Sequence, residues 1–207
     1  MIERSYITLL SLLLIGTAII PGCTGRGTVV PDDHFYQLPE VLPERISNDR
    51  LTNNTIAVAP LHSDGLHGER AILYINSDRP LELQRYHYHH WTDSPPRLIQ
   101  ESLLNYLRKS GLARNVVRYD PEEQVDGTIS GTLLHFERVT GPGGIKVEVA
   151  LELEYNNDQK LPQTWHKEYH VTLPVGNSSI HSTIEGFGSA LQQIFNAFVA
   201  DLKSNPA

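Results

Sequence analysis

The sequence has little positive charge and no second long apolar run. Its 207 residues carry a formal net charge of −7 at pH 7, with 17 lysines and arginines against 24 aspartates and glutamates. A mildly acidic chain without a basic stripe is a poor partner for nucleic acid or for an anionic membrane face. Beyond the N-terminal segment, no apolar run approaches the roughly 20 residues that span a bilayer. No internal repeat of about 20–50 residues is present either.

Cysteine is almost absent as well, and the only one follows the single long apolar run. Arg4 gives the N-terminus a positive charge, residues 7–20 are almost all apolar, and Pro21 and Gly22 lead to Cys23. A charged start, an apolar run too short to span a bilayer comfortably and a small residue before the cut are typical of a secretory signal. Gly22 followed by Cys23 resembles the lipobox of bacterial lipoproteins, with Pro21 in place of the usual Ala or Ser. The alternatives are an ordinary signal cut nearby and an uncleaved anchor.

This segment sets the expected organisation of the chain. We expect residues 1–22 to be a lipoprotein signal peptide and Cys23 to be lipidated. Residues 23–34 then form a tether, and residues 35–207 form a single periplasmic α+β domain. Thr24, in place of an Asp, favours the outer membrane by the same resemblance. Several acyl chains make such an anchor stable, and with Cys23 acylated the domain has no thiol for a disulfide, a metal site or a nucleophile.

The rest of the pattern predicts an α+β, two-layer fold with a mainly antiparallel sheet and two amphipathic helices. Its most regular part is a C-terminal three-strand meander, with strands at 127–139, 145–155 and 165–175. The middle strand alternates apolar and charged residues, which is typical of a half-buried strand. A change of phase near Leu133 and Leu134 predicts a bulge, and Gly141 to Gly144 predicts a hairpin turn.

Shorter strands are expected upstream of the meander. Pro39 and Pro43 keep the first of them out of a central position, and residues 44–54 and 61–69 are expected to be loops. The predicted strands are 35–38, 55–60, 70–76, 81–91 and 116–119.

Two helices are predicted from caps and apolar stripes. Ser94 and Pro95 suit the start of the first, and Gly111 suits its end. Ser182 and Glu185 have the spacing of a capping box and are expected to open the second. The stripe of this second helix is wide enough to cover a sheet: Ile184, Phe187, Leu191, Ile194, Phe195, Phe198 and Leu202.

Histidines are the first candidates for chemistry. His87 and His89 would share one face of a strand, and two such histidines can begin a metal site. Two imidazoles supply at most half of a zinc shell, and the sequence offers no evident third ligand. His62 and His67 could contribute only if their loops meet the strand. We therefore predict no metal site and a polar edge or contact surface, with the role of His87, His89 and His90 left open.

No catalytic set is evident. The glycines of residues 141–144 lie between two strands, without the helix N-terminus that a phosphate loop needs. Ser130 lacks the G-x-S-x-G elbow, and Glu122 and Glu123 lie in a loop. We predict a protein that is not an enzyme and has no cofactor. A histidine metal protein or hydrolase is the competing class.

Aromatic residues are the remaining candidates. Tyr74, Tyr86, Tyr88 and Trp91 lie close together in the sequence, and we predict that they form a partner interface. Tyrosine and tryptophan suit interfaces because they bury much area and keep a polar tip. The alternative is ordinary core packing for at least half of them.

Scattered short strings resemble the family of ABC-type transport auxiliary lipoproteins, which includes the paraquat-inducible protein C type. The likeness covers roughly residues 35–200. The strings are Tyr36 to Leu38, Ile56 to Leu61, Arg70 to Tyr74, Pro80 to Leu83, Trp91, Pro95 to Glu101 and Asp126 to Thr128.

This resemblance implies a non-enzymatic accessory component of an ABC/MCE-type transport system for lipids or hydrophobic compounds. The protein would be lipid-anchored in the outer membrane, face the periplasm and dock the envelope-spanning MCE-domain protein. Homo-oligomeric rings are known in the family, so a homo-oligomer is expected as well. The alternative is a periplasmic lipid- or small-ligand-binding carrier with an apolar pocket between sheet and helices. Cargo, direction of transport and oligomer number are not predicted.

Overall fold

The computed structural model describes residues 30–44, 52–157 and 163–204. The predicted signal peptide, residues 1–22, and the lipidation site Cys23 therefore lie outside the described residues. None of the described helices is both long enough and apolar enough to cross a membrane.

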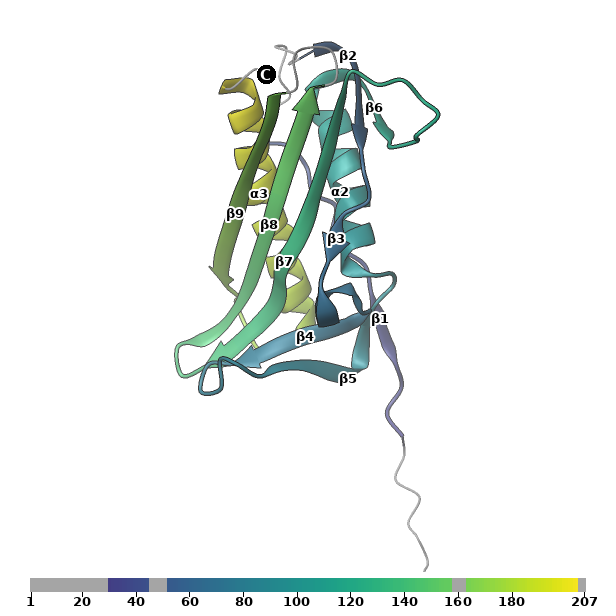
Figure 1. Ribbon diagram of the computed structural model, residues 1–207. Helices are drawn as coiled ribbons and strands as arrows, with labels where there is room; N and C mark the ends of the chain where they lie inside the picture. The colour runs from purple at the N-terminus through teal and green to yellow at the C-terminus, as the bar shows by residue number, and fades with distance from the viewer. Residues whose placement is uncertain (1–29, 45–51, 158–162, 205–207) are drawn as a thin grey trace, which may run out of the picture. The chain divides into compact units, whose positions relative to one another are not determined.

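The C-terminal meander is the most extended part of the sheet (Figure 1). Strands β7 (Gly127–Gly141), β8 (Gly144–Asn157) and β9 (Gln163–Pro174) pair antiparallel, as predicted. Gly141 pairs with Gly144 across a two-residue turn, and Gly144 adopts a φ of 93° that favours glycine. The apolar face of β8 is buried, as the alternation predicts.

A bulge in β7 divides the strand into two halves. Leu133 lies opposite Leu151, but His135 lies opposite Ala150, so Leu134 is the extra residue. The bulge is where the sequence predicts it. Beyond it Phe136 is buried in the core, and His135 is on the other face of the strand because side chains alternate.

Three short segments pair with successive parts of β7, in the order in which they occur in the chain. They are β2 (Thr52–Val58), β3 (His62–Ser63) and β4 (Ala71–Asn76), and each pairs with β7 in parallel. Together they act as one interrupted strand, so no crossover helix is needed between them. The interruption between β3 and β4 holds the short 3-10 helix η1 (Gly65–Gly68).

The remaining strands extend the sheet at both ends. Strand β5 (Leu83–Trp91) pairs antiparallel with β4, and the edge strand β1 (His34–Tyr36) pairs parallel with β5. Strand β6 (Ala113–Arg118) pairs parallel with β2. The described residues thus form one mixed sheet of nine strands.

The predicted mainly antiparallel character of the sheet is not confirmed, because the sheet is mixed. Five of the eight strand pairings among the described residues are parallel, and only those of β4 with β5, β7 with β8 and β8 with β9 are antiparallel. Hydrophobic periodicity gives the exposure of each strand but not the direction of its partner. Two predicted loops also contain strand: residues 52–54 belong to β2, and residues 61–69 include β3 and η1.

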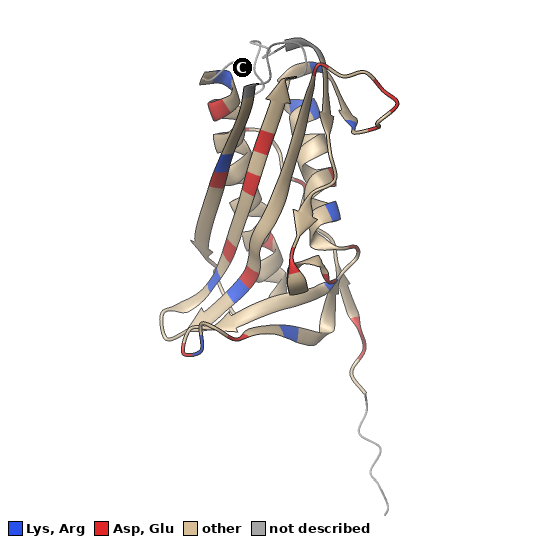
Figure 2. Cartoon of the chain, in the orientation of Figure 1, with Lys and Arg blue, Asp and Glu red and all other residues tan. Residues whose placement is uncertain are grey.

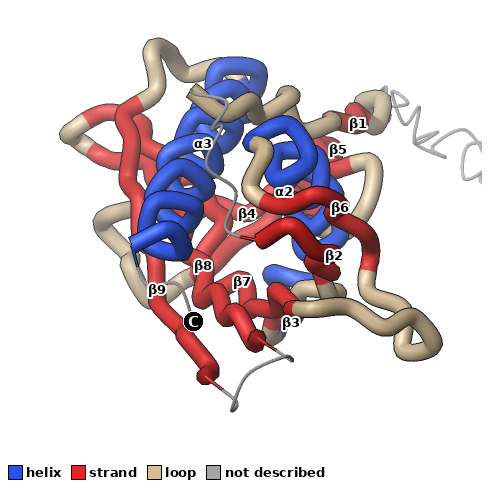
Figure 3. Tube along the Cα trace, turned by 90° about the horizontal axis from the view of Figure 1, so that it is seen from above, coloured by secondary structure: helices blue, strands red, loops and turns tan. Residues whose placement is uncertain are grey.

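Both α-helices cover the same face of the sheet (Figures 1 and 3). Helix α2 (Pro95–Ser110) begins at Pro95 and ends before Gly111, whose φ of 69° is left-handed, as predicted. Ser94 stands at its N-cap but makes no side-chain capping bond. Every residue of the predicted stripe of α3 (Ile180–Ser204) is buried.

The predicted capping box is wrong, because α3 begins two residues before Ser182. Ser179 provides the cap instead: its hydroxyl accepts from the Ser182 backbone N–H at 3.1 Å and its carbonyl from that of Thr183 at 3.3 Å. Asn177 in turn accepts from the Ser179 N–H at 2.9 Å. A run of serines offers several possible caps, and the spacing to Glu185 selects the wrong one.

Candidate functional site

The predicted interface residues divide between surface and core. Tyr74 on β4 and Tyr86 on β5 are half-buried, with ring centroids 4.6 Å apart, and the Tyr74 hydroxyl donates to Gln84 Oε1 at 2.6 Å. Tyr88 is 38% exposed. These three tyrosines lie at one end of the sheet and are the part of the predicted interface that a partner can reach.

Trp91 does not belong to that surface. Its side chain is 1% exposed and contacts Phe136 and Phe187, at centroid distances of 5.3 and 5.6 Å. The inclusion of Trp91 in the interface is therefore corrected. It is the innermost residue of β5, where α3 covers the sheet, and burial of so large an apolar ring stabilises the core.

Histidines line the outer edge of β5, where this strand pairs with the short strand β1. His34 pairs with His89 in register, and their rings stack at 5.2 Å. Tyr36 OH is hydrogen-bonded to His89 Nδ1 at 2.9 Å, and Phe35 lies 5.7 Å from His90. We call residues 34–36 of β1 and 86–90 of β5 the aromatic edge.

A large bulge in β5 shapes this edge. Ala71 lies opposite His90 but Leu73 opposite Arg85, so residues 86–89 face the single residue Ile72. Tyr86 and His89 consequently meet edge to face at 5.5 Å. His87 stays exposed, and its carbonyl accepts from His90 Nε2 at 3.1 Å. Strict alternation is lost within the bulge, and the sequence gives no sign of it.

Partial burial shifts the ionisation of the edge. Burial raises the pKa of the Tyr36 and Tyr86 hydroxyls. Burial, followed by the neighbouring rings of His34 and His90, lowers the pKa of His89.

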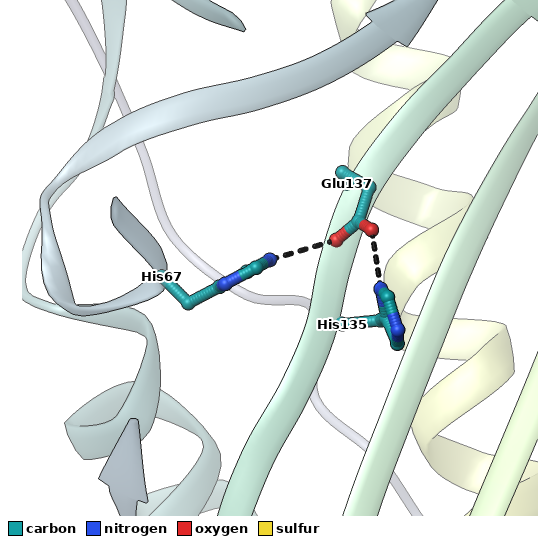
Figure 4. A group of neighbouring side chains, drawn as sticks. All are labelled: His67, His135 and Glu137. Carbon is teal, nitrogen blue, oxygen red and sulfur yellow. Dashed lines mark hydrogen bonds and ion pairs between the residues drawn. The ribbon is translucent and has the colours of Figure 1, made fainter. Parts of the chain in front are cut away.

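A second group of titratable side chains lies on the opposite face from the helices. Glu137 on β7 accepts from His67 Nε2 at 3.1 Å and from His135 Nδ1 at 2.6 Å (Figure 4). The backbone N–H of Phe136 donates to the same carboxylate. We call His67, His135 and Glu137 the β7 cluster.

The fold brings this cluster together from distant parts of the chain. His135 and Glu137 are two residues apart on β7 and share a face. His67 comes from η1, which lies between two segments that run parallel to β7. The carboxylate of Glu137 is 1% exposed although it is on the outer face of the sheet, and contact with His67 contributes to that burial.

Glu137 has no lysine or arginine partner among the described residues; its ion pairs are with the two histidines alone. Burial raises its pKa, but the hydrogen bonds and charges of His67 and His135 outweigh that effect and the pKa lies below its ordinary value. A second pair lies beside it: His135 stacks on His170 at 5.8 Å, and His170 Nε2 donates to Glu148 Oε1 at 2.8 Å.

The predicted histidine pair on β5 is not joined by a third ligand in the described residues. The group of three possible metal ligands that the described part of the chain contains is the β7 cluster. From the sequence, His67 is expected only as an addition to His87 and His89. The signal that could have found the cluster is His135-x-Glu137 on a strand with a bulge just before it.

Two of the hollows on the described surface border the sheet. One, of about 660 Å³, is beside the aromatic edge and is lined by residues that include Arg70, Arg85, Tyr86 and His87. The other, of about 830 Å³, is bounded by the loop 119–126 and the end of β8. Acidic residues recur along β8, whereas Lys and Arg are scattered (Figure 2).

Comparison with known families identifies the chain. It belongs to the family of ABC-type transport auxiliary lipoprotein components, whose family model matches residues 36–199. The resemblance found in the sequence is thereby confirmed. The family is defined as a component of transport systems and as a lipoprotein. No curated protein matches the sequence.

Solved structures share the fold. Protein XCC0632 from Xanthomonas campestris matches with a TM-score of 0.68 at 16% identity, over 80% of this chain and 92% of that chain. An uncharacterized protein matches with a TM-score of 0.66 at 16% identity, over 83% and 99% of the two chains. The hypothetical protein CT253 from Chlamydia trachomatis matches at 0.51 and 8% identity, over 75% and 98%. At these identities the likeness establishes the fold alone.

Proposed function

We propose that this protein is an outer-membrane-anchored periplasmic lipoprotein that docks the MCE-domain protein of an ABC transport system for lipids or hydrophobic compounds. It acts as an accessory component and not as an enzyme. Family membership supports the association with ABC transport. The MCE partner, the outer-membrane anchor and a homo-oligomeric state are the further content of the proposal.

The aromatic edge is the structural feature that supports a docking surface for this partner. Exposed Tyr88 and His87 are neighbours in β5 of Tyr86, whose half-buried ring contacts that of Tyr74. Aromatic side chains that keep polar tips are enriched among the residues that dominate binding energy. A bulged strand with a three-residue neighbour also leaves this region open to a partner.

A binding measurement tests this assignment. Full-length lipoprotein in detergent is titrated with the purified MCE-domain protein of the same transport system. Tyr88→Ala should weaken binding about tenfold, as expected for a tyrosine at the centre of an interface. Tyr119→Ala is the matched control, because Tyr119 is also exposed, at 45%, but follows β6 at the far end of β7.

Three outcomes separate the parts of the proposal. Weaker binding by Tyr88→Ala alone supports the edge. If both variants bind as tightly as the unmodified protein, the assignment of the site is wrong, although the MCE-domain protein is still the partner. No binding by the unmodified protein removes the partner itself.

The anchor is tested separately. Mass spectrometry of the mature protein should show a triacylated N-terminal Cys23, and Cys23→Ser should release the protein from the outer-membrane fraction. Detection of an unmodified cysteine, or of the protein in the inner membrane, would remove this part of the proposal.

The carrier alternative requires an apolar cavity between sheet and helices. In the described residues that interface holds Trp91, Phe136 and Phe187 in mutual contact, with Phe136 and Phe187 stacked at 4.2 Å. Docking is therefore the function that the geometry favours. Native mass spectrometry checks the alternative and the oligomer number together, since lipid that co-purifies at one per chain would support a carrier.

A further inference from the structure

The β7 cluster has the composition of a metal site. It offers two imidazole nitrogens and a carboxylate, and these three donors lie within 4.8 Å of one another. Two histidines and one glutamate are a ligand set that zinc uses in open sites, where a fourth position is left for water or another ligand. In Figure 4 both rings point their nitrogens at the carboxylate.

Burial separates this cluster from an ordinary surface pair. Glu137 is 1% exposed, a buried carboxylate needs a positive charge beside it, and no lysine or arginine of the described residues supplies one. A divalent ion between the three side chains would supply it. The imidazoles would then bind the ion through the nitrogens that now face the carboxylate, Nε2 of His67 and Nδ1 of His135.

Neighbouring groups hold the donors in place. The Phe136 N–H donates to Glu137 Oε2, which fixes the carboxylate. The ring of His135 stacks on that of His170 with an angle of 11° between them, and Glu148 holds His170 in turn. The backbone hydrogen bond to the carboxylate is an outer partner of the kind that orients a metal ligand.

We propose that His67, His135 and Glu137 bind one zinc-type divalent transition-metal ion. His135 is 46% exposed, so the fourth position faces solvent and is filled by water or by a side chain of a partner. The ion joins η1 to β7 and thereby connects two segments about 70 residues apart in the chain. This site is independent of the docking function proposed above.

Titration calorimetry tests the site. Full-length protein without an affinity tag is treated with chelator, dialysed and titrated with zinc chloride. We expect one ion per chain, with affinity reduced by at least about tenfold in Glu137→Gln and in His135→Gln. The control is His87→Gln, which removes an exposed histidine from the aromatic edge and should leave the affinity unchanged.

Two further measurements keep the test decisive. The half-exposed His135 tolerates substitution without loss of core contacts, so His135→Gln reports on the site even if Glu137→Gln unfolds. Cobalt(II) should give the intense visible absorption of a tetrahedral nitrogen and oxygen site in the unmodified protein only. Zinc binding below one ion per chain, or equal affinity in His135→Gln, would overturn the proposal.

Discussion

Strands β5 and β7 both carry histidines beside aromatic side chains, yet they produce different surfaces. Strand β5 holds three histidines in four residues, and its outer neighbour is the three-residue strand β1. Strand β7 holds one histidine, but it is paired on one side with β8 and on the other with β2, β3 and β4. The denser group stays open at the edge, whereas the sparser one surrounds a buried carboxylate.

This difference shows that neighbours in space, and not density in the sequence, decide what histidines can do. On β5 the bulge spreads the side chains along an exposed edge, which suits a contact surface. On β7 the interrupted strand brings η1 over Glu137 and supplies a ligand from 70 residues away.

The largest expected effect comes from the core that the two strands share. Trp91 of β5 contacts Phe136 of β7. Trp91→Ala should lower the free energy of unfolding by about 3–5 kcal/mol, because a large ring leaves a cavity. Chemical denaturation measures the change, with Tyr88→Ala as the surface control at no more than about 0.5 kcal/mol. If Trp91→Ala were as stable as the control, the conclusion that Trp91 is a core residue would be wrong.

The next largest effect is a difference in stability between variants of Glu137 and Glu148, two carboxylates that each accept a hydrogen bond from a histidine. In chelator, Glu137→Gln should reduce the free energy of unfolding by about 1–3 kcal/mol, because the new amide turns a donor toward groups that donate. Glu148→Gln on β8, where the pair with His170 is partly exposed, should cost less than about 0.5 kcal/mol. Equal losses for the two variants would contradict the distinction between them.

A smaller effect is expected within the aromatic edge itself. Tyr86 is half-buried against Tyr74, so Tyr86→Phe keeps the ring contact and removes only the interaction of the hydroxyl with Arg138. Tyr86→Leu should cost about 0.5–1.5 kcal/mol, the energy of an aromatic pair. Thermal unfolding followed by circular dichroism distinguishes the two. Equal stability of both variants would show that the ring contact contributes nothing.

The smallest effect is a pH dependence from His89. Its pKa is lowered in the folded chain, first by burial and then by His34 and His90. Between that lowered pKa and the ordinary pKa of about 6.5, the unfolded state binds more protons. Stability therefore falls as the pH drops below about 6.5. His89→Gln should show a shallower fall between pH 7.5 and 5.5, and an unchanged slope would exclude this contribution.

Local chemistry made much of the fold predictable. The β8 alternation, the phase change at Leu133, the turn glycines and the stripe of α3 each depend on residues close in sequence, and all four predictions are confirmed. The direction of the strands outside the meander was not predictable. The parallel pairing of β2, β3 and β4 with β7 depends on contacts between residues about 65 to 70 apart, which no local pattern encodes.

The sites were less predictable than the fold for the same reason. Tyr88 and Trp91 are three residues apart and chemically similar, yet a bulge leaves one exposed and the helix layer buries the other. The pair of His67 and Glu137 cannot be predicted from the sequence, because only the folded chain brings η1 next to β7. A buried carboxylate opposite a histidine is a property of the assembled sheet.

Photo-crosslinking in living cells tests the central claim, which is that the protein meets its transport partner through the aromatic edge of β5. A photoreactive benzoylphenylalanine is placed at Tyr88 in one strain and at Tyr119 in another. We predict a crosslink to the MCE-domain protein from position 88 and none from position 119. A crosslink from position 119 alone, or from neither position while the lipoprotein is normally produced, would contradict the account.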